Sequence, residues 1–206
     1  MQLSALSLHV VPFWAALDNH DSTTIVTEHC EGDLRSVLEQ AGGALSESAV
    51  RAQVAAPLLE VLVHMHRLGF VHRDIKPENV FVSGKHSMLG DFGLAIALPS
   101  AATGDSNISG ISSSPRCCSS SLTAGSDSSS ASLQAGGTPA YVAPEVVQAT
   151  FNNTSLEVAV GPQNDVWNLG VLVWETLAGR HPFGDHTSSP EAENVPTIFA
   201  DFGAFR

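Results

Sequence analysis

The 206-residue chain is poor in positive charge, with nine Lys and Arg residues against 21 Asp and Glu residues and a formal net charge of −12. A chain this acidic argues against nucleic acid, or an anionic membrane, as the main partner. Only three cysteines occur, Cys30, Cys117 and Cys118, which are too few for a disulfide framework and indicate a reducing compartment. We therefore expect an intracellular protein, in the cytoplasm.

Long apolar runs are also missing. No stretch approaches the ~20 apolar residues of a transmembrane helix, so we expect no membrane segment. Residues 1–17 are largely apolar but contain no Lys or Arg, so we expect no signal peptide. What is present is a chain with 43% hydrophobic residues, long enough for one domain with a substantial core.

Residues 71–94 hold the densest group of side chains suited to catalysis. Residues 72–74 read H-R-D and are followed by Lys76 and Asn79, and residues 91–93 read D-F-G after a short hairpin pattern. The order H-R-D-x-K-x-x-N and then D-F-G resembles the catalytic loop and the magnesium loop of eukaryotic-type serine/threonine protein kinases. A second D-F-G at residues 201–203 follows no H-R-D and is interpreted as a coincidence.

The resemblance implies a role for each polar residue. Phosphoryl transfer depends on positioning and charge neutralisation, so it needs a carboxylate near the attacking hydroxyl and a cation near the transferred phosphate. Asp74 is expected to be the catalytic base and Lys76 the cation. Mg²⁺ prefers hard oxygen ligands, which the amide of Asn79 and the carboxylate of Asp91 supply. The implied reaction transfers the γ-phosphate of ATP, with Mg²⁺, to Ser or Thr of protein substrates.

A block near residue 140 supports the same family. Residues 137–145 read G-T-P-A-Y-V-A-P-E and resemble the end of the activation segment of serine/threonine kinases. By that resemblance, the hydroxyl of Thr138 bonds Asp74 and Lys76, which adds Thr138 to the catalytic residues. Before this block, 14 of the residues from 98 to 136 are serine. Such a segment buries too little apolar surface to offset its ordering entropy, so we expect a disordered insertion in the activation segment.

The start of the chain resembles the end of a kinase small lobe and its hinge. Residues 8–17 and 23–29 read as strands, and residues 34–40 read as a helix. The resemblance implies a nucleotide site here, with a gatekeeper, two residues whose backbone groups face adenine, a carboxylate toward the ribose and an aromatic floor of the adenine pocket. These are, in that order, Thr27, Glu28, Cys30, Asp33 and Phe81.

Two longer helices are expected in the large lobe. Apolar residues at the three-to-four spacing of one helix face predict a helix over residues 45–69, with Ser46 as N-cap, Gly69 as its stop and an interruption at Pro57. The predicted buried face comprises residues 50, 54, 58, 61, 62, 65 and 68. Residues 165–177 are nearly all apolar, which predicts a helix buried on every side. By resemblance, Asp165 at its start braces the catalytic-loop backbone.

We predict an α+β, protein-kinase-like fold that is incomplete. A remnant of the small β lobe with the hinge occupies residues 1–30, and a mainly α-helical large lobe occupies residues 31–206. The 206 residues contain no G-x-G-x-x-G loop, no V-A-I-K lysine motif and none of the family's last helices. Glu145 is therefore expected to lack its arginine partner and to be an unpaired, partly buried carboxylate. We favour a fragment from an incomplete gene model of an active kinase. The alternative is a pseudokinase or interaction module that lacks the ATP-binding lysine.

Arg73 beside Asp74 indicates control by phosphorylation. A cation buried next to a carboxylate favours a second anion, and in the family a phosphorylated residue of the activation segment supplies it. The nearest hydroxyl upstream of the G-T-P block is Ser132, so an upstream activating kinase is an expected partner. The alternative is that Ser132 and the serines before it are solvated linker.

Overall fold

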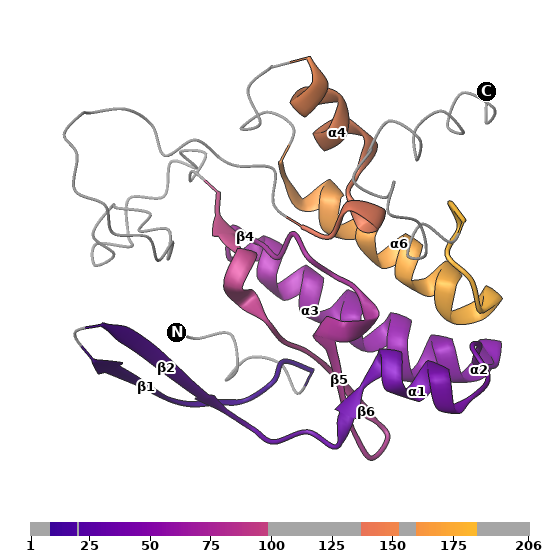
Figure 1. The fold of residues 1–206 in the computed structure, drawn as a ribbon, viewed down its shortest axis with the longest axis horizontal. Coiled ribbons are helices and arrows are strands. Elements are labelled where there is room, and N and C mark those ends of the chain that lie inside the picture. The colour runs from indigo at the N-terminus through magenta and orange to yellow at the C-terminus, as the bar shows by residue number, and fades with distance from the viewer. Residues whose placement is uncertain (1–8, 20, 99–136, 153–159, 185–206) are drawn as a thin grey trace.

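The structure is a computed structural model that describes residues 9–19, 21–98, 137–152 and 160–184. Short strands and helices come first and longer helices follow, so the predicted α+β class is confirmed (Figure 1). Residues 99–136 of the serine-rich segment, Ser132 among them, and the second D-F-G lie outside the described residues. No helix in the described part of the chain is long and apolar enough to cross a membrane.

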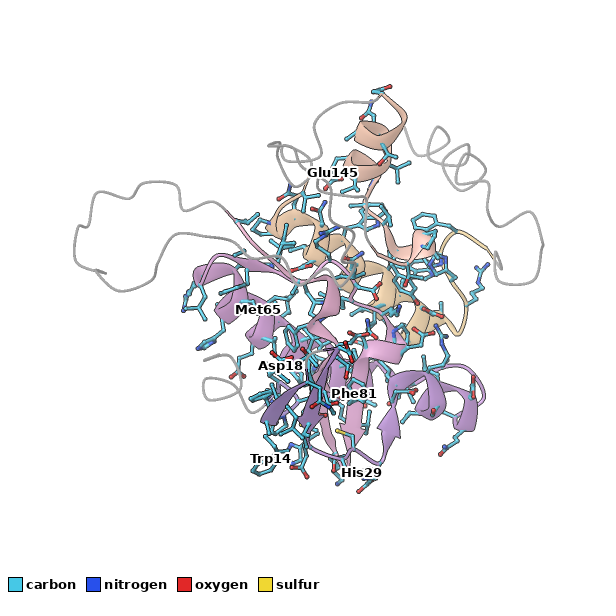
Figure 2. The ribbon with its side chains drawn as sticks, turned by 60° about the vertical axis from the view of Figure 1, so that its left-hand side comes forward. Trp14, Asp18, His29, Met65, Phe81 and Glu145 are labelled. Carbon is cyan, nitrogen blue, oxygen red and sulfur yellow. The ribbon has the colours of Figure 1, made fainter. Side chains whose placement is uncertain are left out.

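A two-stranded antiparallel hairpin stands beside the helical part of the molecule (Figure 1). It consists of β1 (Phe13–Asn19) and β2 (Ser22–Thr27). Thr, Ile and Val side chains fill β2, as strand propensity favours. Both of its faces expose large apolar residues, including Trp14 and Ile25. Figure 2 shows Trp14 on this hairpin, and Met65 inside the helical part.

The residues before β1 join the hairpin to the large lobe. The Val11 N–H donates to the Leu89 carbonyl at 2.9 Å, and the Leu89 N–H donates to the His9 carbonyl at 2.7 Å. The first strand therefore begins later than the sequence predicts, because residues 9–11 pair with a different sheet. That sheet has the order β3-β5-β6, with β3 (Gly32–Asp33), β5 (Val80–Ser83) and β6 (His86–Leu89).

The hinge leads directly into α1 (Leu34–Gln40), which has the predicted bounds. The Asp33 carboxylate caps this helix by accepting from the Ser36 N–H at 2.8 Å. Leu34 and Leu38 on its inner face are buried in the core. A side chain that was predicted to face the ribose thus also fixes the start of a helix.

The long predicted helix is built from three consecutive segments, α2 (Glu47–Ala49), the π-helical η1 (Val50–Ala55) and α3 (Ala56–Arg67). Ser46 caps the start as predicted, and Gly69, at φ +78°, follows the end. Pro57 has no N–H to donate to an α-helical hydrogen-bond ladder. The predicted interruption of the helix is found as the π-helical segment η1, which ends just before Pro57. The predicted inner face is buried except at Leu68, which is exposed because it lies beyond the last helical turn.

The second long helix is α6 (Pro162–Ala178), which packs across α3 (Figure 1). Its Leu169 and Leu172 are buried in the main core, but Val166, Trp174 and Leu177 are 57%, 51% and 41% exposed. The prediction of a helix buried on every side is therefore wrong. An apolar sequence does not by itself supply a covering partner, and the described elements cover only one side of α6.

The remaining elements are short and lie around the loops between the long helices. They are β4 (Phe70–Val71), η2 (Pro77–Asn79), η3 (Phe92–Leu94), β7 (Ile96–Ala97), η4 (Pro139–Tyr141) and α4 (Pro144–Phe151). Glu145 in the first turn of α4 accepts from the Asn164 amide at 2.9 Å. The expectation of an unpaired Glu145 is therefore wrong, because the first turn of α6 supplies a neutral donor instead of an arginine.

Candidate active site

The loop after β4 is held in place by Asp165 of α6, whose side chain is fully buried. Its two carboxylate oxygens accept the N–H groups of His72 at 2.9 Å and Arg73 at 2.8 Å. His66 of α3 adds a third contact, from its Nε2 to Asp165 at 2.8 Å. The predicted bracing of the catalytic loop is confirmed, and Arg73 is held there at a left-handed φ of 74°.

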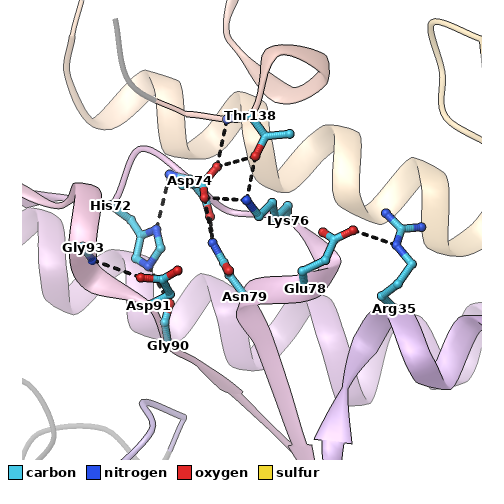
Figure 3. A network of polar contacts seen from close by, with 10 residues as sticks. All are labelled: Arg35, His72, Asp74, Lys76, Glu78, Asn79, Gly90, Asp91, Gly93 and Thr138. Atoms are coloured by element: carbon cyan, nitrogen blue, oxygen red, sulfur yellow. Dashed lines mark hydrogen bonds and ion pairs between the residues drawn. The ribbon is translucent and has the colours of Figure 1, made fainter. Parts of the chain in front are cut away.

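Asp74 lies at the centre of the polar network in Figure 3. One carboxylate oxygen, Oδ1, accepts from the Thr138 N–H at 2.9 Å and from the Thr138 hydroxyl at 2.8 Å. The other, Oδ2, accepts from the Asn79 amide at 2.9 Å and pairs with the Lys76 ammonium at 2.8 Å. Burial raises the pKa of this carboxyl, but the hydrogen bonds from Lys76 and Thr138 outweigh burial and hold the pKa below its ordinary value.

Thr138 brings the end of the activation segment to the catalytic loop. Its hydroxyl also accepts from the Lys76 ammonium at 2.7 Å, so the contacts predicted for Thr138 are confirmed. Gly137 permits this approach, since its φ is +118° and an added Cβ atom would lie 2.8 Å from the Arg73 carbonyl oxygen.

His72 links the catalytic loop to the D-F-G turn. Its Nε2 lies 3.0 Å from the Gly90 carbonyl, its Nδ1 accepts from the Asp74 N–H at 3.4 Å, and its ring meets Phe92 edge-on at 5.0 Å. Burial lowers the pKa of this imidazole and outweighs the nearby carboxylates that raise it. A neutral ring with the proton on Nε2 satisfies both hydrogen bonds.

Asn79 and Asp91 supply the donor set predicted for Mg²⁺. The Asn79 Nδ2 donates to the Asp74 carbonyl at 2.8 Å and to its carboxylate at 2.9 Å, which leaves the amide oxygen for a cation. The Asp91 carboxylate is exposed, and within the described part of the chain it accepts only a long 3.3 Å bond, from the Gly93 N–H. One carboxylate and one amide oxygen fit an ion that keeps water and phosphate ligands. Accordingly, the described residues contain no cluster of three His, Cys, Asp or Glu side chains that could hold a metal alone.

Three of the residues predicted to bind the nucleotide, Thr27, Glu28 and Cys30, lie at the end of β2 and directly after it. Thr27 ends that strand, and the next N–H, of Glu28, donates to the Pro12 carbonyl at 2.8 Å. Among the described residues, the Glu28 carbonyl receives only two long contacts, from the Thr27 hydroxyl at 3.5 Å and the Cys30 thiol at 3.9 Å, so it is left for a ligand. Burial, and then the nearby Glu28, raise the pKa of the Cys30 thiol, so it is protonated at neutral pH.

Phe81 lies on β5 opposite Asp33, beside the D-F-G turn. A Cβ atom added at Gly90 would lie 2.6 Å from the Phe81 ring, so glycine before Asp91 allows the ring to pack against the backbone. The fold thus brings the hinge, the aromatic ring and the turn into one region. Their nucleotide-binding roles stay predictions.

Sequence reasoning missed two sets of polar residues. One is His66 of α3, which contacts Asp165 of α6. The other is a network of Arg35, Glu78, Tyr141 and Glu175 at the edge of the site. The only signal for the second set was the position of Glu78 between Lys76 and Asn79 in the catalytic motif.

Together, the fold and this polar network define a phosphoryl-transfer domain of the protein-kinase type. The family model described as protein kinase domain matches residues 1–201. Similar curated proteins include maternal embryonic leucine zipper kinase of Danio rerio, which is 29% identical over 86% of this chain and 21% of the relative.

Two other relatives carry serine/threonine kinase names. Serine/threonine-protein kinase cds1 of Schizosaccharomyces pombe is 31% identical over 93% of this chain and 35% of the relative. Serine/threonine-protein kinase dkf-2 of Caenorhabditis briggsae is 32% identical over 92% of this chain and 13% of the relative. The chain thus spans only a minor part of each relative. The chain belongs to the protein kinase family, and the predicted serine/threonine-type domain is confirmed. Members of this family use ATP and Mg²⁺ and act on proteins.

Proposed function

We propose that this domain transfers the γ-phosphoryl group of ATP to Ser or Thr hydroxyls of protein substrates, with Asp74 as the base. The observation that supports this most directly is the set of four contacts on the Asp74 carboxylate, from Lys76, Asn79 and both donors of Thr138. They hold the carboxylate ionised and in one orientation. Such positioning is the main contribution of a protein to this reaction.

The contacts also indicate how the acceptor hydroxyl enters. A carboxylate has about four lone-pair sites, and all of those on Asp74 face donors. An incoming hydroxyl must therefore replace one donor, and the long, flexible side chain of Lys76 is the one that can swing away. Asp74 then accepts the hydroxyl proton as the hydroxyl oxygen bonds to the γ-phosphorus and the bond from that phosphorus to the β,γ-bridging oxygen breaks, which releases ADP. Lys76 neutralises charge on the transferred group.

Asn79 and Asp91 are proposed to hold Mg²⁺, which when bound neutralises the phosphate charge. The backbone of Glu28 and Cys30 is proposed to face adenine, with Thr27 at the back and Phe81 below. Asp33 is proposed to reach the ribose through the carboxylate oxygen that does not cap α1, since Oδ1 accepts from both Ser36 groups.

The test is phosphate transfer to Ser- and Thr-containing peptides by the longest natural polypeptide that contains these residues. Asp74→Asn and Asp91→Ala should each lower kcat at least ~10²-fold, the usual cost of removing one charge-stabilising group. Asp18→Asn, on the exposed hairpin, is the matched control and should leave kcat unchanged. Full activity in either active-site variant would refute the assignment. A folded wild type that never transfers phosphate would favour the pseudokinase alternative.

An upstream kinase that phosphorylates Ser132 completes the proposal. A phosphate carries about −1.5 to −2 charges and pairs well with arginine, and Arg73 precedes the catalytic base. Activity after treatment with an activating kinase should be lower in Ser132→Ala than in the wild type. Equal activities, with no phosphate found by mass spectrometry between Ser126 and Ser132, would exclude this control.

A further inference from the structure

Arg35 on α1 joins three parts of the domain that are far apart in the chain. Its Nε donates to Glu78 of η2 at 2.9 Å (Figure 3), and its Nη1 donates to Glu175 of α6 at 2.7 Å. Its Nη2 lies 3.4 Å from the Tyr141 hydroxyl of η4, which in turn donates to the second oxygen of Glu175. One guanidinium therefore connects two carboxylates and a phenol.

The network holds more negative than positive charge and is partly buried. The side chains of Glu175 and Glu78 are 10% and 45% exposed, and Arg35 is the cation that pairs with both. Burial lowers the pKa of Arg35, but the two carboxylates outweigh burial and raise it. Burial and then Glu175 raise the pKa of Tyr141, so the phenol remains a hydrogen-bond donor. The rigid fork of arginine suits this task, because lysine cannot point fixed donors at several acceptors.

The two loops that Arg35 contacts are those that hold the Asp74 carboxylate. Glu78 immediately precedes Asn79, which donates to Asp74, and Tyr141 lies three residues after Thr138, which donates to the other oxygen. Thr138 is also the N-cap residue immediately before η4. Movement of either loop would change the donors around the base.

We propose that Arg35 is a positioning residue that fixes the end of the activation segment against the catalytic loop. It touches no reacting atom, and the inference rests on the proposed function. Loss of Arg35 should affect the peptide acceptor, because η4 lies beside the base. It should not affect ATP, because the hinge contact of Glu28 and the cap at Asp33 do not involve Arg35. We expect the KM for peptide and kcat to depend on Arg35, and the KM for ATP to be independent of it.

Tyr141 makes the network directly observable, because it is the only tyrosine among the 206 residues. Labelling the chain with 3-fluorotyrosine gives a single fluorine resonance that needs no assignment. In the wild type we expect one narrow line. Arg35→Met should shift and broaden this line, whereas Arg51→Met, which removes an exposed arginine of η1, should leave it unchanged.

The same variants are then assayed in the longest natural polypeptide that contains these residues. Arg35→Met should lower kcat/KM for the peptide about 10- to 100-fold, the range expected when a reacting group is displaced by about an ångström. The KM for ATP should change by less than about twofold. Arg35→Lys should give an intermediate kcat/KM, since it restores the charge but not the fork.

A double variant separates positioning from stability. Arg35→Met leaves Glu175 as a buried carboxylate without its cation, so the single variant should also unfold at a lower temperature. Adding Glu175→Gln removes that buried charge and should restore the melting temperature, but it should restore neither the fluorine line nor kcat/KM for the peptide. Recovery of all three would show a role in stability alone and overturn the proposal. An unchanged fluorine line and peptide KM in Arg35→Met, with Asp74→Asn still inactive, would overturn it while the proposed function stands.

Discussion

Replacing Asp165 by asparagine tests how the catalytic loop is held. The two loop N–H groups of His72 and Arg73 both end on this carboxylate, which has no solvent exposure. Asparagine has the same shape but only one acceptor oxygen, so one N–H would face an NH₂ group. The substitution thus removes one charge-assisted hydrogen bond and leaves a buried donor unsatisfied.

The size of the effect follows from these contacts. A hydrogen bond to a charged group contributes roughly 1.5–3 kcal/mol, and an unsatisfied buried donor costs about 1–3 kcal/mol. We expect Asp165→Asn to lower the free energy of unfolding by about 2–4 kcal/mol. Asp165→Ala leaves both N–H groups without an acceptor, so it should lower the free energy of unfolding further. Because whole domains are stable by only about 5–15 kcal/mol, either loss is large.

The assay is equilibrium unfolding in urea, followed by tryptophan fluorescence. Asp18→Asn makes the same chemical change at an exposed position and should stay within about 0.5 kcal/mol of the wild type. If Asp165→Asn matched that control, with an unchanged denaturant slope, the carboxylate would not be what holds the loop, and the explanation given for the loop conformation would fail.

Three further outcomes are expected. Gly137→Ala should lower the free energy of unfolding by at least about 1–3 kcal/mol and lower activity, because it places a Cβ atom against the Arg73 carbonyl at a left-handed φ. Gly170→Ala, in open space within α6, should be neutral or slightly stabilising. The folded pKa of His72 lies below its ordinary 6.5, so only the unfolded state gains a proton as the pH falls through that value. Unfolding measured at about pH 7 and about pH 5.5 should show a lower free energy at the acidic value, with a smaller difference in His72→Gln. A polypeptide of these 206 residues alone should bind ATP weakly and turn it over negligibly, since it lacks a glycine-rich loop and a strand lysine; robust peptide phosphorylation that a catalytic-base substitution abolishes would contradict this.

The sequence predicts well those features that depend on neighbouring residues. The predicted bounds of α1 match the structure, in which the Asp33 carboxylate caps the helix and Leu34 and Leu38 face the core. The β5–β6 hairpin lies where turn residues separate two apolar runs. The contacts of Thr138 were predicted because two motifs in fixed order imply them. In each case a local pattern or a family motif determines the outcome.

Other features depend on elements that meet only in the folded chain. Asn164 is a partner of Glu145 because the first turns of α4 and α6 meet, and nothing near Glu145 in the sequence indicates this. Arg35 meets partners 43 to 140 positions away. The exposure of one side of α6 likewise depends on which elements cover it, and not on its own composition.

The contacts on Asp74 and Asp165 also have a consequence for the order of folding. Thr138 is 64 positions from Asp74, and Asp165 is 93 positions from His72. Contacts between such distant residues become favourable only after the loop between them has closed, so this region should gain protection from hydrogen exchange later than α3 during refolding. Closing a loop twice as long costs only about 0.6 kcal/mol more. The spacing between the D-F-G turn and the G-T-P block can therefore vary widely with little penalty, provided that Thr138 still reaches the base.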